Sequence, residues 1–175
     1  MEFLEQSLEA TLYVIIAFLA LYMMKLVTDR FVKKYYQADV EISDNSNSAI
    51  AFRRAGLYIG FALGFAGSLG GSASSTLIDE LLLQGLDFAL ISLFLLLSFF
   101  IADKVLLPHI DNTQALLENN QAVGVVEMGL YIATGIIASA SFSGSGSVWD
   151  STLFFTLGQF VLIFVGFIYE LKSRY

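Results

Sequence analysis

The chain has 175 residues, of which 57% are hydrophobic and 14% are charged; its formal net charge is -7 and its mean hydropathy is +0.72. An ordinary soluble domain has about a quarter charged residues, so this composition indicates a membrane protein. With no cysteine and one histidine, the chain excludes disulfides and thiolate metal sites and leaves little for imidazole-based zinc or general-base chemistry. We therefore expect no metal, no cofactor and no nucleic-acid partner.

Five charge-poor stretches dominate the sequence. A bilayer core of about 30 Å needs about 20 apolar helical residues to cross it. The stretches that satisfy this length lie at about 10–27, 49–67, 81–102, 123–142 and 151–169. The sequence therefore predicts an all-α, polytopic membrane helix bundle with five transmembrane helices.

A polar connection follows the first span, which is apolar apart from Lys25. The connection, residues 29–48, carries two lysines and two tyrosines at 33–36, followed by three acids. Such a segment is typical of a solvated loop whose tyrosines lie at the level of the lipid headgroups. A binding site for lipid headgroups is the alternative.

The second span carries a row of glycines. Asn47 or Ser48 is placed to cap its first turn through a side-chain oxygen. Gly56, Gly60 and Gly64 follow at four-residue spacing, which stacks them on one helix face and lets another backbone approach closely. This pattern predicts a helix-packing face, with a lining for a pore or ligand as the alternative.

The passage around this span occurs twice. Residues 45–51 and 56–59 match residues 118–124 and 129–132 when Gly56 is overlaid on Gly129. The economical interpretation is a tandem repeat of a two-helix unit. The boundaries that follow are residues 1–80 for the first repeat, 81–148 for the second, and 149–175 for the fifth span and its tail.

The same overlay assigns further candidate residues. It places Asn120 on Asn47 as the second cap, and it adds Gly129 to the packing face. It also places Glu127 on Arg54, which makes these two residues a candidate ion pair where the two repeats meet. Extension of both side chains to water is the alternative.

Charge predicts the orientation. The connections 28–48 and 103–122 and the C-terminus share one side of the membrane. All nine Lys and Arg residues lie on that side or close to it. The positive-inside rule places that side in the cytoplasm, so we expect the N-terminus outside. Both repeats then enter the membrane in one direction, as parallel repeats related by an axis along the membrane normal.

The doubled motif resembles the YjfL-like small inner-membrane proteins of bacteria, a family with a duplicated two-helix unit of unknown function. The residues that carry the resemblance are Ile42, Asn45–Ala49, Gly56, Gly60, Pro108, Asn119–Ala122, Gly124 and Gly129. The fifth span lies outside the four-helix pattern of the short members, and Arg53-Arg54 departs from the apolar residues expected there. The resemblance implies a polytopic protein of the bacterial inner membrane and no catalytic residues.

Two classes of function follow from these patterns. The first is a non-enzymatic scaffold or partner subunit, in membrane-integrity or stress assemblies. It would sit in the lipid bilayer and associate with copies of itself or with other membrane or cytoplasmic subunits through its glycine faces. The alternative is an ion channel or transporter subunit, because a hydrophobic gate or a carbonyl-lined path needs no mid-membrane charge. An enzyme is not expected, since no serine has a candidate base.

Overall fold

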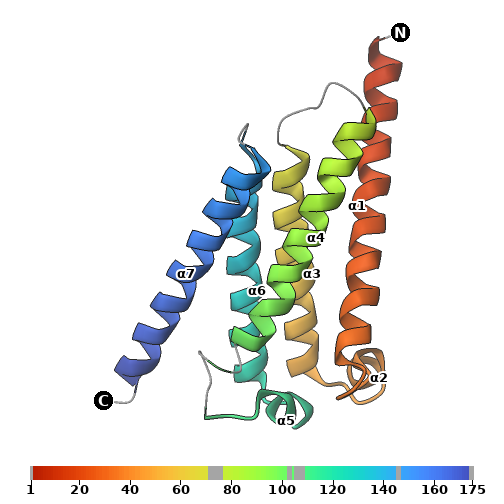
Figure 1. Ribbon diagram of the computed structural model, residues 1–175. Helices are drawn as coiled ribbons and strands as arrows, with labels where there is room; N and C mark the ends of the chain where they lie inside the picture. The colour runs from red at the N-terminus through yellow and green to blue at the C-terminus, as the bar shows by residue number, and fades with distance from the viewer. Residues whose placement is uncertain (1, 71–76, 102–103, 105–108, 145–146, 174–175) are drawn as a thin grey trace.

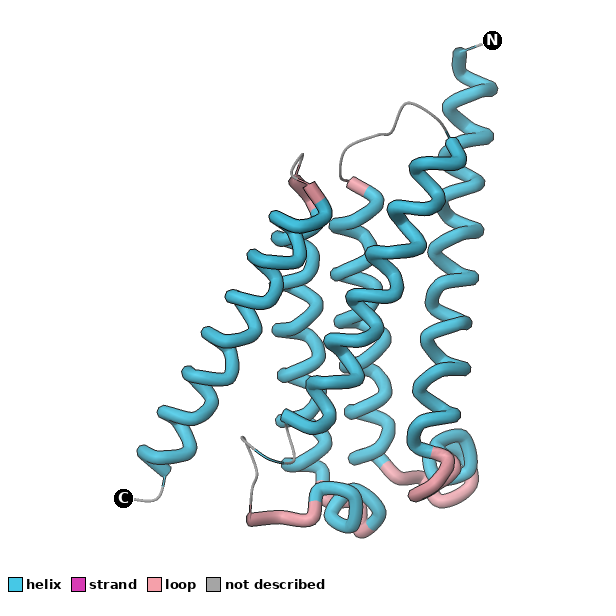
Figure 2. The backbone as a smooth tube through the Cα atoms, viewed as in Figure 1, coloured by secondary structure: helices cyan, strands magenta, loops and turns pink. Residues whose placement is uncertain are grey.

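The computed structural model describes residues 2–70, 77–101, 104, 109–144 and 147–173. Within these residues every regular element is a helix and there is no strand (Figure 2). In chain order the helices are α1 (Glu2–Val32), α2 (Ala38–Ser43), α3 (Ser48–Leu69), α4 (Leu77–Ile101), α5 (Asn112–Leu117), α6 (Gln121–Phe142) and α7 (Val148–Ser173). The predicted all-α class is therefore confirmed.

Five of these helices are long and apolar enough to cross a membrane. Their candidate spans are Thr11–Val32, Ser48–Leu69, Leu81–Ser98, Gln121–Phe142 and Val148–Tyr169, with mean hydropathies between 1.2 and 2.1. The helices run side by side, and α1 begins at the opposite end of the bundle from the end of α7 (Figure 1). The helices themselves extend beyond the predicted spans, most of all α1, which begins near the N-terminus and continues to Val32.

The pair α3 and α6 forms the centre of the bundle. Both helices have 22 residues, and their mutual contact is the most extensive in the fold. The diagonal α4 contacts both of them, and α7 packs on α6 (Figure 1). Phe61, Ile91, Leu95 and Phe155 are fully buried among these helices. Because lipid gives no hydrophobic force between helices, close packing of this kind must hold the bundle together.

The short helices α2 and α5 lie in the segments predicted as polar connections. Asp111 caps α5, since its Oδ1 accepts a hydrogen bond from the backbone N–H of Gln114 at 3.0 Å. Tyr36 and Leu116 are buried together with Ile50 in a second, smaller apolar cluster. Helices of six residues are too short to show a helical period, so the sequence pattern does not predict them.

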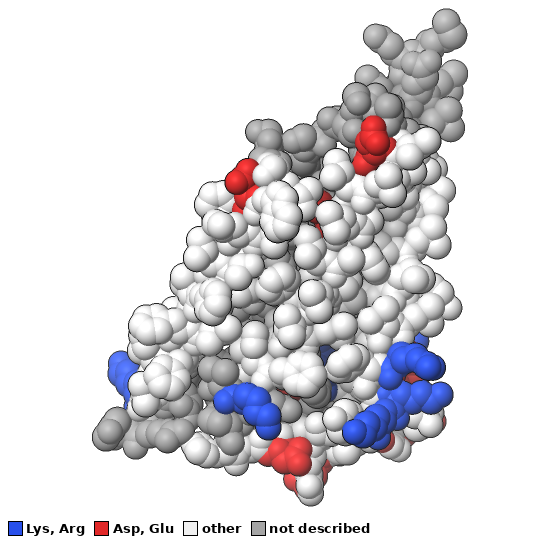
Figure 3. Space-filling view, viewed as in Figure 1, with Lys and Arg blue, Asp and Glu red and all other residues white. Residues whose placement is uncertain are grey.

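Charge separates the two ends of the bundle. Figure 3 shows Lys and Arg gathered at the end that carries α2 and α5, which we call the basic end. The helices α4 and α7 begin at the other end, which we call the acidic end (Figure 1), and Asp79 and Asp150 lie in their first turns. Acids are also present at the basic end, among them Asp29 and Asp39 beside Lys25. Which end faces the cytoplasm stays a prediction.

Candidate functional site

The contact between α3 and α6 depends on glycines. A Cβ placed at Gly60 would collide with the backbone carbonyl of Tyr131, and one placed at Gly135 would collide with the backbone of Gly60 itself. A Cβ at Gly124 would lie 2.5 Å from the carbonyl oxygen of Ala49. These separations are shorter than van der Waals contact, so only glycine allows the two backbones to approach this closely.

The predicted packing face needs one correction. Gly56 lies against the backbone of Met128, and Gly64 lies beside Ala138 and Ile91, as a packing face requires. Gly129 does not belong to this face, because a Cβ there would meet nothing within 4 Å. The overlay does not predict these contacts within one chain, because matched residues have different neighbours: Gly56 packs against Met128 of α6, whereas a Cβ at Gly129 would meet no described atom within 4 Å.

Asn47 and Asn120 both occupy N-cap positions. Asn47 Oδ1 accepts a hydrogen bond from the N–H of Ile50 at 3.0 Å. Asn120 Oδ1 accepts from the N–H groups of Ala122 and Val123, at 3.1 and 3.4 Å. Each side chain thus satisfies N–H groups that the first turn of a helix leaves without a partner.

Among the contacts of the described residues, only the Asn47 cap also connects the start of α3 to the end of α5. Asn47 is buried, and its Nδ2 donates to the carbonyl oxygen of Leu116 at 2.8 Å. In return, Asn119 Oδ1 accepts from the N–H of Ala49 at 3.0 Å. Asn119 and Ser46 occupy matched positions and both have a positive φ, of 60° and 52°. Asn119 is part of the repeated motif, but nothing in the sequence alone distinguished its role from that of Asn120.

A buried ion pair joins α3 to α6, and it differs from the predicted one. Arg53, not Arg54, pairs with Glu127, with Nε and Oε2 2.9 Å apart. Their side chains are 8% and 1% exposed. Arg53 Nη1 also donates to the hydroxyl of Tyr36 at 2.6 Å. The predicted Arg54–Glu127 pair is wrong, because consecutive helical residues point about 100° apart and only Arg53 faces α6.

Arg54 belongs to a second cluster, which ties α3 to α1 and α2. Its guanidinium pairs with Asp29 at 2.7 Å and with Asp39. Lys25 completes the cluster, 2.7 Å from Asp29 and 3.0 Å from Asp39. Hydrogen bonds from Lys25 and then Arg54 hold the pKa of the Asp39 carboxyl below its ordinary value. Two cations and two anions thus neutralise one another at the basic end.

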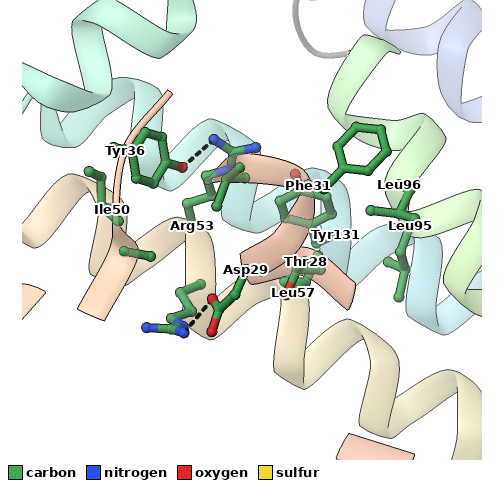
Figure 4. A pocket seen from close by; sticks show the side chains of 13 residues that line it. Thr28, Asp29, Phe31, Tyr36, Ile50, Arg53, Leu57, Leu95, Leu96 and Tyr131 are labelled. Carbon is green, nitrogen blue, oxygen red and sulfur yellow. Dashed lines mark hydrogen bonds and ion pairs between the residues drawn. The ribbon is translucent and has the colours of Figure 1, made fainter. Parts of the chain in front are cut away.

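The buried arginine borders a small cavity of about 40 Å³ (Figure 4). Thr28, Asp29, Tyr36, Arg53, Leu95 and Tyr131 are among the residues that line it. A volume of this size admits a water molecule or a few, whereas small-molecule sites usually measure about 300–1,000 Å³. Within the described part of the chain, no three His, Cys, Asp or Glu residues could hold a metal ion together. The arrangement resembles a structural polar core more than a reaction site.

The fold and its buried polar core define the class of this molecule as a polytopic, all-helical membrane protein. Within that class the chain belongs to a family described as a domain of unknown function, DUF350. The family model matches residues 2–142 and, in a second match, residues 80–174. The two matches together extend over the five long helices, so the membership concerns the whole bundle.

One curated protein similar to the chain is a UPF0719 transmembrane protein of Aquifex aeolicus strain VF5. It is 29% identical over 145 residues, which are 81% of this chain and 51% of the relative. The chain therefore spans about half the length of the relative that it matches. No solved structure matches the chain.

Proposed function

We propose that this protein is a non-enzymatic scaffold or partner subunit of the bacterial inner membrane, and that it assembles with copies of itself through α6. We also propose that the chain is a tandem repeat of a two-helix unit and that its basic end faces the cytoplasm. A relation to the YjfL-like proteins is part of the same proposal. The observation that carries it is the difference between two matched glycines. Gly56 packs against Met128 of α6, whereas Gly129 is exposed and a Cβ at its position would meet nothing within 4 Å.

Small residues continue along the open face of α6. Ala122, Gly129 and Ala140 are exposed, and Ala133 is partly exposed. They follow one another at spacings of seven, four and seven residues, which keeps them on one side of a helix. A second copy in the same membrane orientation can bring its own α6 alongside, with Gly129 near Gly129 across a twofold axis along the membrane normal.

Two glycines provide a matched test of this contact. Gly129→Leu should shift the protein to monomers, whereas Gly85→Leu on α4 should leave the assembly unchanged. Neither substitution meets another atom within 4 Å of its Cβ, so both variants should fold. Native mass spectrometry from mild detergent measures the stoichiometry of each.

Cross-linking tests the same contact in native membranes. The chain has no cysteine, so Gly129→Cys introduces a single thiol. A disulfide requires Cα atoms about 4.4–6.8 Å apart, and it should therefore form between two Gly129→Cys chains but not between two Gly85→Cys chains. Monomeric wild type without cross-links would overturn self-assembly. Ion flux through reconstituted monomers would then favour the channel or transporter alternative.

A further inference from the structure

We infer that an open cavity at the basic end binds the phosphodiester of a phospholipid headgroup. The cavity has a volume of about 820 Å³ and lies between the turn after α1 and the helix α5. Lys34 and Tyr35 line it from the turn, and Thr113 and Gln114 line it from α5. Lys104 is a further lining residue. This site is separate from the buried Arg53 and from the α6 face, so it does not depend on the proposed self-assembly.

The position of the cavity fits a headgroup. The candidate spans of α1 and α4 end at Val32 and Ser98, and that of α6 begins at Gln121. Lys34 and Lys104 follow the span ends at Val32 and Ser98 by two and six positions, and Leu117 and Glu118 precede Gln121 by four and three. The cavity therefore opens at the border of the apolar bundle, the level at which phospholipid headgroups lie.

Within the described residues, neither of the two lysines in the cavity pairs with a carboxylate, although Asp111 and Glu118 also line the cavity. Lys25, Arg53 and Arg54 all pair with carboxylates at the same end. Lys34 and Lys104 are exposed and form no ion pair within the described residues. A phosphate oxygen can accept charge-assisted hydrogen bonds from such ammonium groups.

The two acids in the lining favour a phosphate group with one negative charge over one with two. Asp111 Oδ1 accepts from the N–H of Gln114 at 3.0 Å, and Glu118 Oε1 accepts from Gln114 Nε2 at 2.9 Å. Both carboxylates are thus held in place by α5, and they repel additional negative charge in the cavity. A phosphodiester with one negative charge fits this lining better than a free phosphate with about two.

The apolar part of the lining favours a lipid over a soluble phosphate. Ile110 and Leu117 line the cavity and are 44% and 40% exposed. Tyr35 is 49% exposed and lies under the ammonium of Lys34, 5.6 Å from the ring centre. Exposed apolar groups beside a pair of cations match the glycerol and the first acyl carbons that follow a lipid phosphate.

The test compares two double variants of the full chain. Lys34→Gln with Lys104→Gln removes the cavity cations, and Arg30→Gln with Lys33→Gln removes the same charge from exposed residues outside this cavity. Native mass spectrometry with added phosphatidylglycerol measures the bound lipid. Loss of one charge-assisted contact lowers affinity by about tenfold or more, so we expect the cavity variant to lose at least that factor and the control less than twofold.

Soluble probes separate a lipid site from a phosphate site. Inorganic phosphate and glycerol 3-phosphate should not displace the lipid, and Leu117→Ser should weaken the binding of phosphatidylglycerol. Equal losses in both double variants would overturn the site in favour of diffuse attraction to a charged surface. Displacement by either soluble phosphate at concentrations equal to the lipid would overturn the lipid as ligand.

Discussion

Arg53 of α3 and Glu127 of α6 face each other across the central helix pair, with Nε and Oε2 2.9 Å apart. Both residues lie within candidate membrane spans, where a lone charge is costly. Each charge thus compensates the other inside the membrane span. The contact also fixes the rotation of α3 relative to α6.

Removal of one partner should destabilise the bundle strongly. Glu127→Gln leaves the buried guanidinium without its carboxylate, and we expect a loss of about 3–5 kcal/mol in the free energy of unfolding. Asp44→Asn, at an exposed position, should change stability by less than about 0.5 kcal/mol. Unfolding in mixed detergent micelles measures both. Equal stabilities would show that Arg53 reaches water or another partner.

Aspartate should distinguish the two caps. Asn120→Asp keeps the acceptor oxygen that caps α6, so it should retain nearly wild-type stability. Asn47→Asp also keeps the cap but loses the Nδ2 donor to the carbonyl of Leu116, and it should cost about 1–3 kcal/mol. Alanine at Asn120 should cost about 0.5–2 kcal/mol. Equal tolerance of aspartate at both sites would contradict the buried hydrogen bond from Asn47 to Leu116.

Even alanine should be excluded at Gly60. Its Cβ would overlap the backbone of Tyr131, and that backbone cannot turn away as the end of a side chain can. We expect Gly60→Ala to cost about 1–3 kcal/mol and Gly60→Leu to prevent folding. Gly85→Ala meets no neighbour and serves as the control. The measurement is thermal stability in one mild detergent, and a wild-type value for Gly60→Ala would disprove the close approach.

Single cysteines can determine the orientation. Gly144 is exposed near the acidic end of α6, and Asp44 is exposed at the end of α2. If the basic end is cytoplasmic, an impermeant thiol reagent should label Gly144→Cys in intact cells and Asp44→Cys only after the membrane is opened. The reverse labelling pattern would place the N-terminus inside.

The cluster around Asp39 should make part of the stability sensitive to acid. The folded pKa of Asp39 is lowered, so its contribution is complete above the unfolded pKa of about 3.9 and is lost as the pH falls through the folded pKa. The Tm difference between wild type and Asp39→Asn should be constant from pH 7 to about 5 and should shrink below about pH 4. Because the side chain is 65% exposed, the difference should be small. A difference that grows in acid would contradict the sign.

The sequence predicted the five long helices because lipid imposes a simple rule. Within a bilayer core every backbone polar group must find a partner inside its own segment, so an apolar run of about 20 residues is read as a helix. The caps at Asn47 and Asn120 were equally predictable, since capping depends on residues within the first helical turn.

Only the tertiary structure decided which neighbours these residues meet. The overlay of the two motifs could not tell that Arg53 rather than Arg54 faces Glu127, because one residue turns the side chain by about 100° about the helix axis. Nor could it tell that Gly56 is packed while Gly129 is open. Matched sequences specify matched local backbones, but helix contacts depend on what lies on each side, and α3 has α6 beside its glycines whereas α6 presents Gly129 to open space.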